Sequence, residues 1–318
     1  MSIPLSYGTP SFKLFLGQES GVPMHSRLLR HFLGVVEKRN ITAAAEALNI
    51  SQPALTRSIR QLEKTIGVPL FDRLPNGVAL TKPGEVLARR VKLMQLEYRH
   101  ALSEISALEQ GMTGVLRIAA GPMWVAVILP DVITAFHQQF PKVKVRVTEG
   151  AIDSIVPALM AGEIDLACVT LAFPSQPELV KEPLVGVRHA LVARTNHPLA
   201  GKGVVKAEDL ARYPWVVLAN DSVGTGRIGS YLVANGLEPP QIAIEATSIG
   251  MLRVLEGSDF LGLFSTVMVD FAKRFGLVTI PHEGTFWEAE AGLAYLRTNR
   301  PARTLETFKS RVRAAVSG

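Results

Sequence analysis

One predicted helix carries polar side chains of the kind that bind an extended anion. It begins at the N-cap Ser51, accepts Pro53 in its first turn, runs to about Lys64 and ends before Gly67. Its apolar residues fall on one stripe and predict a buried face: Leu55, Ile59, Leu62 and Ile66. The opposite face offers an amide, a hydroxyl and three cations, which can hydrogen-bond to phosphates or to base edges: Gln52, Thr56, Arg57, Arg60 and Lys64.

The positive charge of the chain is concentrated around this helix. The 318 residues carry a formal net charge of +6. Residues 25–92 hold 12 Lys and Arg against 5 Asp and Glu, whereas residues 93–318 hold 21 against 22. This asymmetry predicts a polyanion-binding head on a neutral body, or else a basic surface that only water solvates.

Short predicted elements surround the helix in a characteristic order. Two helices precede it, the second of them capped by Thr42 and followed by a short turn. After it, two apolar runs flank Pro75-Asn76-Gly77, which is a hairpin signal. The order of helix, helix, turn, helix and hairpin predicts a winged helix-turn-helix over residues 24–81, with the helix-turn-helix itself at 41–60.

The pattern of residues 82–111 predicts one long helix. Thr81 can cap it, and no Gly or Pro interrupts it between Gly84 and Gly111. Apolar residues step along it by four and three in a sustained heptad seam: Leu87, Val91, Met94, Tyr98, Ala101, Ile105 and Leu108. Such a seam must be covered either by a second copy of the chain or by the chain's own body, and the strict repeat favours a second copy.

Residues 112–318 alternate between strand and helix patterns. The stretch from GVLRIAA to DLACVTLA reads as βαβαβ, which predicts a parallel sheet with helices on its faces. A second series runs from RHALVAR through WVVLAN and helices from Arg227 and Ser248 to FLGLFS. We therefore expect two lobes with a ligand cleft between them, lobe I at about 112–173 and 283–318 and lobe II at about 174–282.

Composition narrows the class of protein. The chain is 47% hydrophobic, has no run of 18 apolar residues and has a single cysteine, Cys168, so it predicts a globular protein without a membrane span or an intrachain disulfide. Residues 1–23 lack the pattern of a secretory signal and are expected to form an extension. The histidines are scattered, and no HExxH or nucleophile elbow occurs, so we expect no metal, no cofactor and no catalytic residues.

Two other functions, a dinucleotide-binding enzyme and a transport solute-binding protein, fit single features of the sequence. Residues Gly224 to Gly229 spell a literal GxGxxG, the fingerprint of a dinucleotide-binding enzyme. The fingerprint should follow its strand at once, yet ANDSV intervenes after WVVL, so a flexible loop that starts a helix is the simpler interpretation. A transport solute-binding protein would need a signal peptide and would not need a basic N-terminal domain, so both features oppose this function.

Residues along nearly the whole chain resemble one known family. The stretch FLGVVEKRNITAAAEALNISQPALTRSIRQLEKTIGVPLFDRLPNGVALTKPGE is similar to the N-terminal domain of LysR-type transcription regulators, and GVLRIAAG, FPKVKV, LMAGEIDLACV and NHPLAG follow the family's order. The resemblance covers residues 24 to about 315. It departs at Thr56, where many members carry Ser, and at Ser265 and Thr266, where many members have Pro. The stretch YPWVVLAND…NGLEPP is similar to a sugar-linked subgroup, the regulators of a galactose-binding protein.

The resemblance implies the fold and the partners. We expect an α/β protein with an N-terminal winged helix-turn-helix, a long coiled-coil linker helix (82–111) and a C-terminal two-lobed, periplasmic-binding-protein-like effector domain (112–318). The resemblance also implies a cytoplasmic regulator rather than an enzyme, a dimer formed through the linker helix and usually a tetramer. Its partners are promoter DNA and a small-molecule effector such as a sugar or a small organic acid, and contact with RNA polymerase is left open.

The resemblance also assigns roles on double-stranded DNA. Helix 51–64 is expected to lie in the major groove, with Gln52 suited to adenine and Arg57 to guanine or phosphate. Thr56 offers a hydroxyl or a methyl group, and Arg60 and Arg73 suit the phosphate backbone. Ser51 and Pro53 start the helix, and Ser51 can also contact phosphate.

The effector is expected between the lobes, where helix N-termini and strand ends converge. Free N–H groups at the start of the GPMW helix, and at Ser248, could hold a carboxylate or a sugar hydroxyl. The candidate residues follow from this placement, and each of them could instead only maintain the fold: Pro122, Met123, Trp124, Thr170, Asn220, Asp221 and Ser248.

Overall fold

The computed structural model describes residues 26–75, 77–110, 114–297 and 302–317. The predicted extension 1–23 lies outside these residues. The chain divides into two compact units, Met1–Arg99 and His100–Gly318, which are described separately here. Within the described residues, no helix has the length and apolar character needed to cross a membrane.

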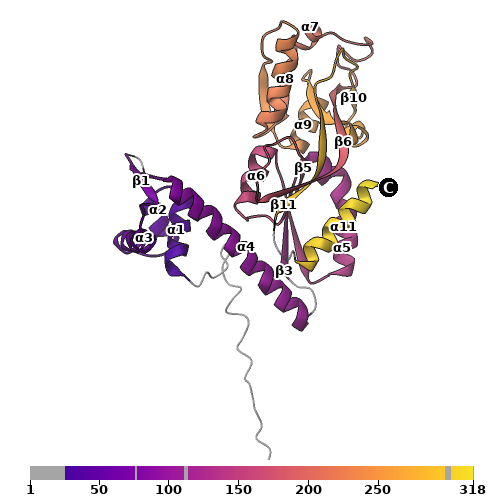
Figure 1. Ribbon diagram of the computed structural model, residues 1–318. Helices are drawn as coiled ribbons and strands as arrows, with labels where there is room; N and C mark the ends of the chain where they lie inside the picture. The colour runs from indigo at the N-terminus through magenta and orange to yellow at the C-terminus, as the bar shows by residue number, and fades with distance from the viewer. Residues whose placement is uncertain (1–25, 76, 111–113, 298–301, 318) are drawn as a thin grey trace, which may run out of the picture. The chain divides into compact units, whose positions relative to one another are not determined.

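The first unit contains three helices, a hairpin and the start of a long helix (Figure 1). Their bounds are α1 (Arg27–Lys38), α2 (Ile41–Ala47), α3 (Gln52–Ile66), β1 (Phe71–Leu74), β2 (Gly77–Leu80) and α4 (Lys82–Gln110). The strands pair antiparallel from Phe71↔Leu80 to Leu74↔Gly77. The winged helix-turn-helix arrangement is therefore confirmed.

Local capping explains where these helices begin and end. The Ser51 hydroxyl accepts from the Ala54 N–H at 3.4 Å at the start of α3, and Gly67 ends that helix with a left-handed φ of 88°. The Thr81 hydroxyl accepts from the Gly84 N–H at 3.1 Å and starts α4 as predicted. The predicted cap Thr42 is wrong, because the Asn40 side chain accepts from the Ala43 N–H at 3.1 Å and starts α2 two residues earlier. Asn is at least as good a cap as Thr, so the sequence did not separate the two.

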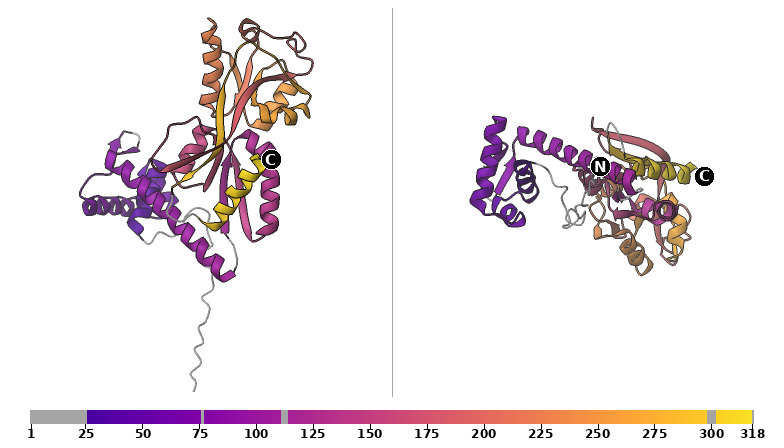
Figure 2. Two further views of the ribbon diagram at one scale, coloured as in Figure 1. Left: turned by 45° about the vertical axis from the view of Figure 1, so that its right-hand side comes forward. Right: turned by 90° about the horizontal axis from the view of Figure 1, so that it is seen from below.

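The second unit has two lobes (Figures 1 and 2). In lobe I the strand order is β6-β11-β5-β3-β4, and β5, β3 and the edge strand β4 are parallel. The helices α5 and α11 cover one face and meet through Phe136 and Phe308, whose ring centroids are 5.2 Å apart. The lobe's elements are β3 (Gly114–Ala120), α5 (Leu129–Gln139), β4 (Val143–Glu149), α6 (Ile152–Met160), β5 (Leu166–Thr170), β6 (Leu179–Arg194), β11 (Glu288–Leu296) and α11 (Arg303–Ser317).

Lobe II is built on the far end of β6. Residues 189–194 of β6 pair with β9 on one side and β10 on the other, while β7 pairs with β8 in parallel. A single bridge between Trp215 and Leu261 links these two sheets. The elements are α7 (Ala207–Leu210), β7 (Trp215–Leu218), α8 (Ser222–Ala234), β8 (Ile242–Ala246), α9 (Ser248–Glu256), β9 (Gly262–Ser265), η3 (Thr266–Met268), α10 (Val269–Lys273) and β10 (Leu277–Thr279).

The chain crosses between the lobes at other residues than the predicted boundaries, 173/174 and 282/283. The first half of β6 pairs with β11 within lobe I, from Leu179↔Leu296 to Arg188↔Glu288, and β6 then continues into lobe II. Pro183 and Gly186 interrupt the strand pattern of this segment, which is why the sequence indicated a strand only from Arg188. Gly292 lies at the register shift in β11, where a Cβ would overlap the Glu182 carbonyl oxygen.

A π-helical turn, η2 (Trp124–Ile128), precedes α5. It is closed by the Leu129 N–H, which donates to the Trp124 carbonyl. Pro130 follows directly and has no N–H with which to continue an α-helical ladder. Such turns are often found at functional sites, and this one places Met123 and Trp124 at the carboxyl end of β3.

Candidate nucleic-acid interface and ligand cavity

The helix α3 buries one face and exposes the other. Leu55, Ile59 and Leu62 are buried in the core of the first unit, together with Phe32 and Val35 of α1. Full burial of such side chains stabilises a fold by roughly 1.5–3 kcal/mol each, so this packing fixes which face of α3 meets solvent. Ile66, which was predicted to share the buried face, is instead 42% exposed, because it lies in the last turn of α3.

The exposed face carries the predicted DNA contacts. Gln52, Arg57 and Arg60 are exposed, and Thr56 is partly buried. The Gln52 amide donates to the Thr56 hydroxyl at 3.4 Å, so these two side chains lie together on one turn. Ser51 and Pro53 are exposed at the start of the helix, and Arg73 is exposed on β1 of the hairpin.

The arginines of this surface are not neutralised within the first unit. No ion pair among the described residues includes Arg57, Arg60 or Arg73. The nearby Glu63 carboxylate instead accepts from the Leu70 N–H at 2.8 Å and from the Phe71 N–H at 3.4 Å, where it holds the start of the hairpin. The cationic groups are therefore available to an external anion.

A buried polar pair, which the sequence did not reveal, holds α3 against α1. His31 Nδ1 and the Ser58 hydroxyl are 2.7 Å apart, and both side chains are buried. Burial and the neighbouring Arg30 and Arg27 lower the pKa of His31, which favours a neutral ring. Because Ser58 follows Arg57 directly, this pair sets the rotation of the exposed face.

The predicted seam of α4 is partly exposed. Met94 and Ile105 have 57% and 53% of their surface exposed, and Ala101 is exposed as well. Val91 is buried, and Leu87 packs partly against the core of the first unit. Tyr98 is partly buried, and the side chain of Leu108 lies outside the described set.

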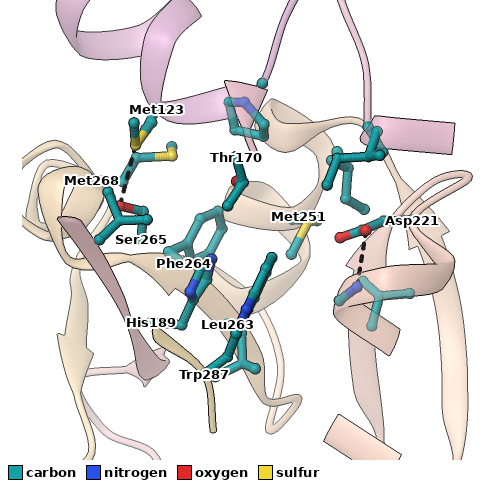
Figure 3. Close-up of a pocket in the computed structure, with 18 of the residues that line it drawn as sticks. Met123, Thr170, His189, Asp221, Met251, Leu263, Phe264, Ser265, Met268 and Trp287 are labelled. Atoms are coloured by element: carbon teal, nitrogen blue, oxygen red, sulfur yellow. Dashed lines mark hydrogen bonds between the residues drawn. The ribbon is translucent and has the colours of Figure 1, made fainter. Parts of the chain in front are cut away.

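A cavity of about 110 Å³ lies between the two lobes of the second unit (Figure 3). Lobe I contributes η2 and the residues just before it, the start of α6 and the end of β5. Lobe II contributes β7, α8, β9 and Met251 of α9. Two residues of the connecting strands, Val187 and His189, complete it together with Trp287.

Five of the seven predicted effector residues line this cavity: Pro122, Met123, Trp124, Thr170 and Asp221. Asn220 and Ser248 are not among the lining residues. Asn220 has a left-handed φ of 57° and turns the chain from β7 into α8. Ser248 is not the cap of α9 as predicted, because the Thr247 side chain accepts from the Gly250 N–H at 3.3 Å and performs that role.

Several lining residues were missed because they come from distant parts of the chain. They are His189, Met251, Phe264, Ser265, Met268 and Trp287. His189 and Trp287 stack with ring centroids 4.3 Å apart, and the Ser265 hydroxyl lies 3.4 Å from Met123 Sδ (Figure 3). The sequence drew attention to this strand only through the departure from the family pattern at Ser265 and Thr266, which spoke against carrying over the family's effector contacts there.

The polar groups of the cavity are few. Burial lowers the pKa of His189 to about 4, against a smaller opposing effect of a hydrogen bond with the Trp287 backbone, so its ring is neutral near pH 7. Burial also raises the pKa of the Asp221 carboxyl, with a smaller contribution from Asp153 and an opposing hydrogen bond from Gly224. Within the described residues, the buried Trp124 Nε1 and His189 Nδ1 have no hydrogen-bond partner.

Two carboxylates of lobe I bind helix N-termini of lobe II. Glu149 Oε1 accepts from the Ser248 N–H at 3.2 Å at the start of α9. Asp153 Oδ2 accepts from the Ser222 N–H at 2.7 Å at the start of α8. The Ser248 amide, which was expected to be free for a carboxylate or a sugar hydroxyl of the effector, therefore already holds a carboxylate of the protein.

The GxGxxG segment does not form the predicted loop. Gly224 to Gly229 lie inside α8, which starts at Ser222 behind the N-cap Asp221 and not at Arg227. A dinucleotide fingerprint needs its first glycine in the turn before the helix, so this segment lacks the required geometry. Gly224 instead allows a close approach, because a Cβ there would overlap the Asp221 carboxylate, whereas a Cβ on Gly226 would meet no atom of the described residues within 4 Å.

Cys168 is fully buried in the core of lobe I. Burial raises the pKa of its thiol far above the usual range. Since the thiolate is the reactive form, this cysteine is expected to be inert toward oxidants.

Comparison with known proteins identifies the family. The LysR substrate binding domain matches residues 109–317, and the bacterial regulatory helix-turn-helix of the lysR family matches residues 26–85. The transcriptional regulator PcaQ of Agrobacterium fabrum is 28% identical over 292 residues, which cover 91% of this chain and 94% of PcaQ. The regulator CysB of Burkholderia cenocepacia is 32% identical over 237 residues, which cover 73% of this chain and 74% of CysB.

Solved structures with a similar fold include another LysR family regulator, CbnR. Full-length CbnR, solved in complex with its target DNA, matches with a TM-score of 0.56 at 23% identity, over 92% of this chain and 100% of CbnR. The substrate-binding domain alone spans well over half of the 318 residues. The chain therefore belongs to the LysR family, whose members are DNA-binding transcription regulators with an effector domain and not enzymes.

Proposed function

We propose that the chain binds promoter DNA by inserting the exposed face of α3 into the major groove. Gln52, Thr56 and Arg57 read base edges near the start of the helix, since an amide matches adenine and a guanidinium matches guanine. Arg60 and Arg73 bind phosphates, and Ser51 and Pro53 fix the beginning of the helix. The observation that carries the proposal is a set of exposed arginines, which have no ion-pair partner among the described residues, opposite the buried side chains of Leu55, Ile59 and Leu62.

We further propose that two copies pair through α4. The exposed Met94 and Ile105 belong to one heptad seam, and a second copy would cover them. Pairing would place two copies of α3 on half-sites about one helical turn, or a multiple of it, apart. Pairs of dimers would give the tetramer implied by the resemblance. Because the proposed partner is chromosomal DNA, we place the protein in the cytoplasm.

The cavity between the lobes is proposed as the effector site. It is enclosed by both lobes, so a ligand bound there touches groups that move relative to one another if the lobes open. Occupancy would then change the lobe arrangement and, through α4, the spacing of the DNA-binding units.

The DNA-binding proposal is tested with the full chain and the DNA segment upstream of its own gene. Arg57→Ala should weaken specific binding by roughly 1–3 kcal/mol, because a bidentate base contact is lost. Lys64→Ala, two turns further along the same exposed face, is the matched control and should change affinity less. Unchanged affinity of the Arg57→Ala protein in a titration at fixed salt would refute the assignment of α3.

A further inference from the structure

The chemistry of the cavity between the lobes indicates which class of effector it accepts, provided that the cavity is the effector site as proposed above. Anions bind proteins most readily at helix N-termini and at Lys or Arg side chains. Both possibilities can be checked around this cavity.

The helix N-termini of lobe II are already occupied. Asp153 takes the first amide of α8, at 2.7 Å from the Ser222 nitrogen, and Glu149 takes that of α9, at 3.2 Å from the Ser248 nitrogen. An anionic effector would have to displace a carboxylate of the protein or bind beside one. Two like charges brought together in a partly buried site repel each other more strongly than they would in water.

Cationic side chains are missing from the cavity wall. Among the described lining residues none is Lys or Arg, and the single charged side chain is Asp221. Arg227 touches the outer part of the site, with Cζ 5.8 Å from the centroid of the Trp287 ring, but it is not a lining residue. Two helix starts of lobe I also face the cavity. At the turn that begins with Pro122, the predicted free N–H groups of Trp124 and Val125 instead donate to the Gly121 carbonyl, at 3.0 and 3.2 Å. The partial positive charge at the start of α6, about half a unit, is opposed by the Asp221 carboxylate.

The Asp221 carboxylate has one oxygen available to a ligand. Its Oδ1 accepts from the Gly224 N–H at 2.9 Å, and this is the hydrogen bond of the carboxylate that the structure gives within the described residues. Figure 3 shows the other oxygen turned toward Met251, into the cavity. A hydrogen-bond donor, and above all a protonated amine, is the natural partner of such an oxygen.

The rest of the wall is apolar and polarizable. Met123, Met251 and Met268 lie around the space together with Phe264 and Trp287 (Figure 3). A volume of about 110 Å³ is somewhat smaller than the roughly 150 Å³ of an engineered apolar cavity that holds benzene. The body of the ligand is therefore compact and hydrophobic, about the size of one ring.

We propose that this cavity takes a small amine with a compact apolar body, bound through its amino group to Asp221, and that it excludes carboxylates and phosphates of the same size. This is a narrower class than the sugar or organic acid expected from the sequence. Asp221 is then the residue that determines the charge of the ligand.

The test compares three probes of matched size on the full chain by titration calorimetry: benzylamine, benzyl alcohol and benzoate. Benzylamine should bind most tightly, and at least tenfold more tightly than benzoate. Asp221→Asn keeps a good N-cap on α8 and should remove the preference for the amine. Asp153→Asn also removes a carboxylate at the start of α8, but one outside the cavity wall, and should leave the preference in place.

Three results would overturn the proposal: benzoate binding as tightly as benzylamine, an unchanged preference in the Asp221→Asn protein, or no binding of any probe at millimolar concentration. Failure of the proposed effector function looks different. In that case benzylamine binds with the expected preference but promoter affinity does not change when the cavity is filled. Tight benzoate binding that does change promoter affinity would keep the effector function and refute only the amine.

Discussion

The exposed face of α3 and the cavity between the lobes carry opposite charges: α3 presents arginines, and the cavity wall presents a carboxylate. On α3, Arg57 and Arg60 have no carboxylate partner among the residues of the first unit that the structure describes, and they are open to a polyanion. In the cavity Asp221 is the charged group, and Glu149 and Asp153 occupy the neighbouring helix N-termini. If both proposals hold, the protein binds the DNA backbone through its first unit, and phosphates and other abundant anions do not compete for the ligand site of its second unit.

The two regions also differ in construction. The residues on α3 lie on consecutive turns of one helix, and they act on DNA in two copies if the chain pairs through α4. The cavity is enclosed within a single second unit and draws on both lobes. DNA binding should therefore depend on pairing, whereas ligand binding should not. A substitution that prevents pairing should therefore separate the two activities.

The largest effect is expected from breaking the seam of α4. The double substitution Met94→Lys and Ile105→Lys puts charges on two side chains that are more than half exposed in the isolated chain. If two half-sites are bound at once, losing the pair removes an avidity factor on the order of 100 or more in promoter affinity. The affinity for benzylamine should stay the same.

Val86→Lys is the matched control, since Val86 is 50% exposed on the same helix but lies outside the seam. Sedimentation velocity should show a single subunit for the double variant and the native assembly for the control. A double variant that still sediments as a dimer, or that binds promoter DNA normally as a monomer, would remove the distinction between the two regions.

A smaller effect concerns the stability of the second unit. The pKa of His189 is lowered from 6.5 to about 4 in the folded protein, so the unfolded chain takes up a proton first as the pH falls. His189 therefore does not lower the free energy of unfolding above pH 6.5. As the pH falls from 6.5 to about 4, that free energy decreases by about 3 kcal/mol in total.

The substitution His189→Gln should remove this part of the pH dependence. Thermal denaturation of the full chain between pH 7 and pH 4 should show a smaller loss of the effector-domain melting temperature in the variant than in the native chain. Promoter affinity at pH 7 should not depend on the substitution through charge, because the ring is already neutral there. Identical pH profiles for the two proteins would show that the buried ring does not resist protonation.

The smallest effect is expected at Arg60. A phosphate contact contributes about 0.9 to the slope of log affinity against log salt concentration. The proposed dimer loses two such contacts, one from each copy, so Arg60→Ala should reduce that slope by about two and weaken binding to all DNA sequences alike. A loss confined to the specific site would instead make Arg60 a base-reading residue and would extend the recognition face of α3.

The sequence predicted the first unit almost completely. The interval between Ser51 and Gly67 carries its cap, its apolar stripe, its polar face and its stop signal within a few turns, and local physics decides each of them. The error at Thr42 was a choice between two good caps two residues apart. The position of the buried His31–Ser58 pair could not be predicted, because it depends on how α1 crosses α3.

The cavity was predicted only in part, for a physical reason. Pro122, Met123, Trp124, Thr170 and Asp221 were found because helix starts and strand ends have local signals. His189 and Trp287 lie 98 positions apart and meet only through the antiparallel pairing of β6 and β11, which Pro183 and Gly186 concealed. Nor could the sequence show that Glu149 would reach Ser248, 99 positions away. The assignment to a galactose-linked subgroup stays a prediction.

Footprinting on the DNA upstream of the gene tests the central claim most directly. The full chain, probed with hydroxyl radicals and by guanine methylation interference in low-salt buffer, should protect two segments whose centres lie about one helical turn, or a multiple of it, apart. Methylation of guanine N7 within those segments should block binding, because Arg57 would need that atom in the major groove. A single protected segment, or no protection at all, would contradict the paired presentation of α3.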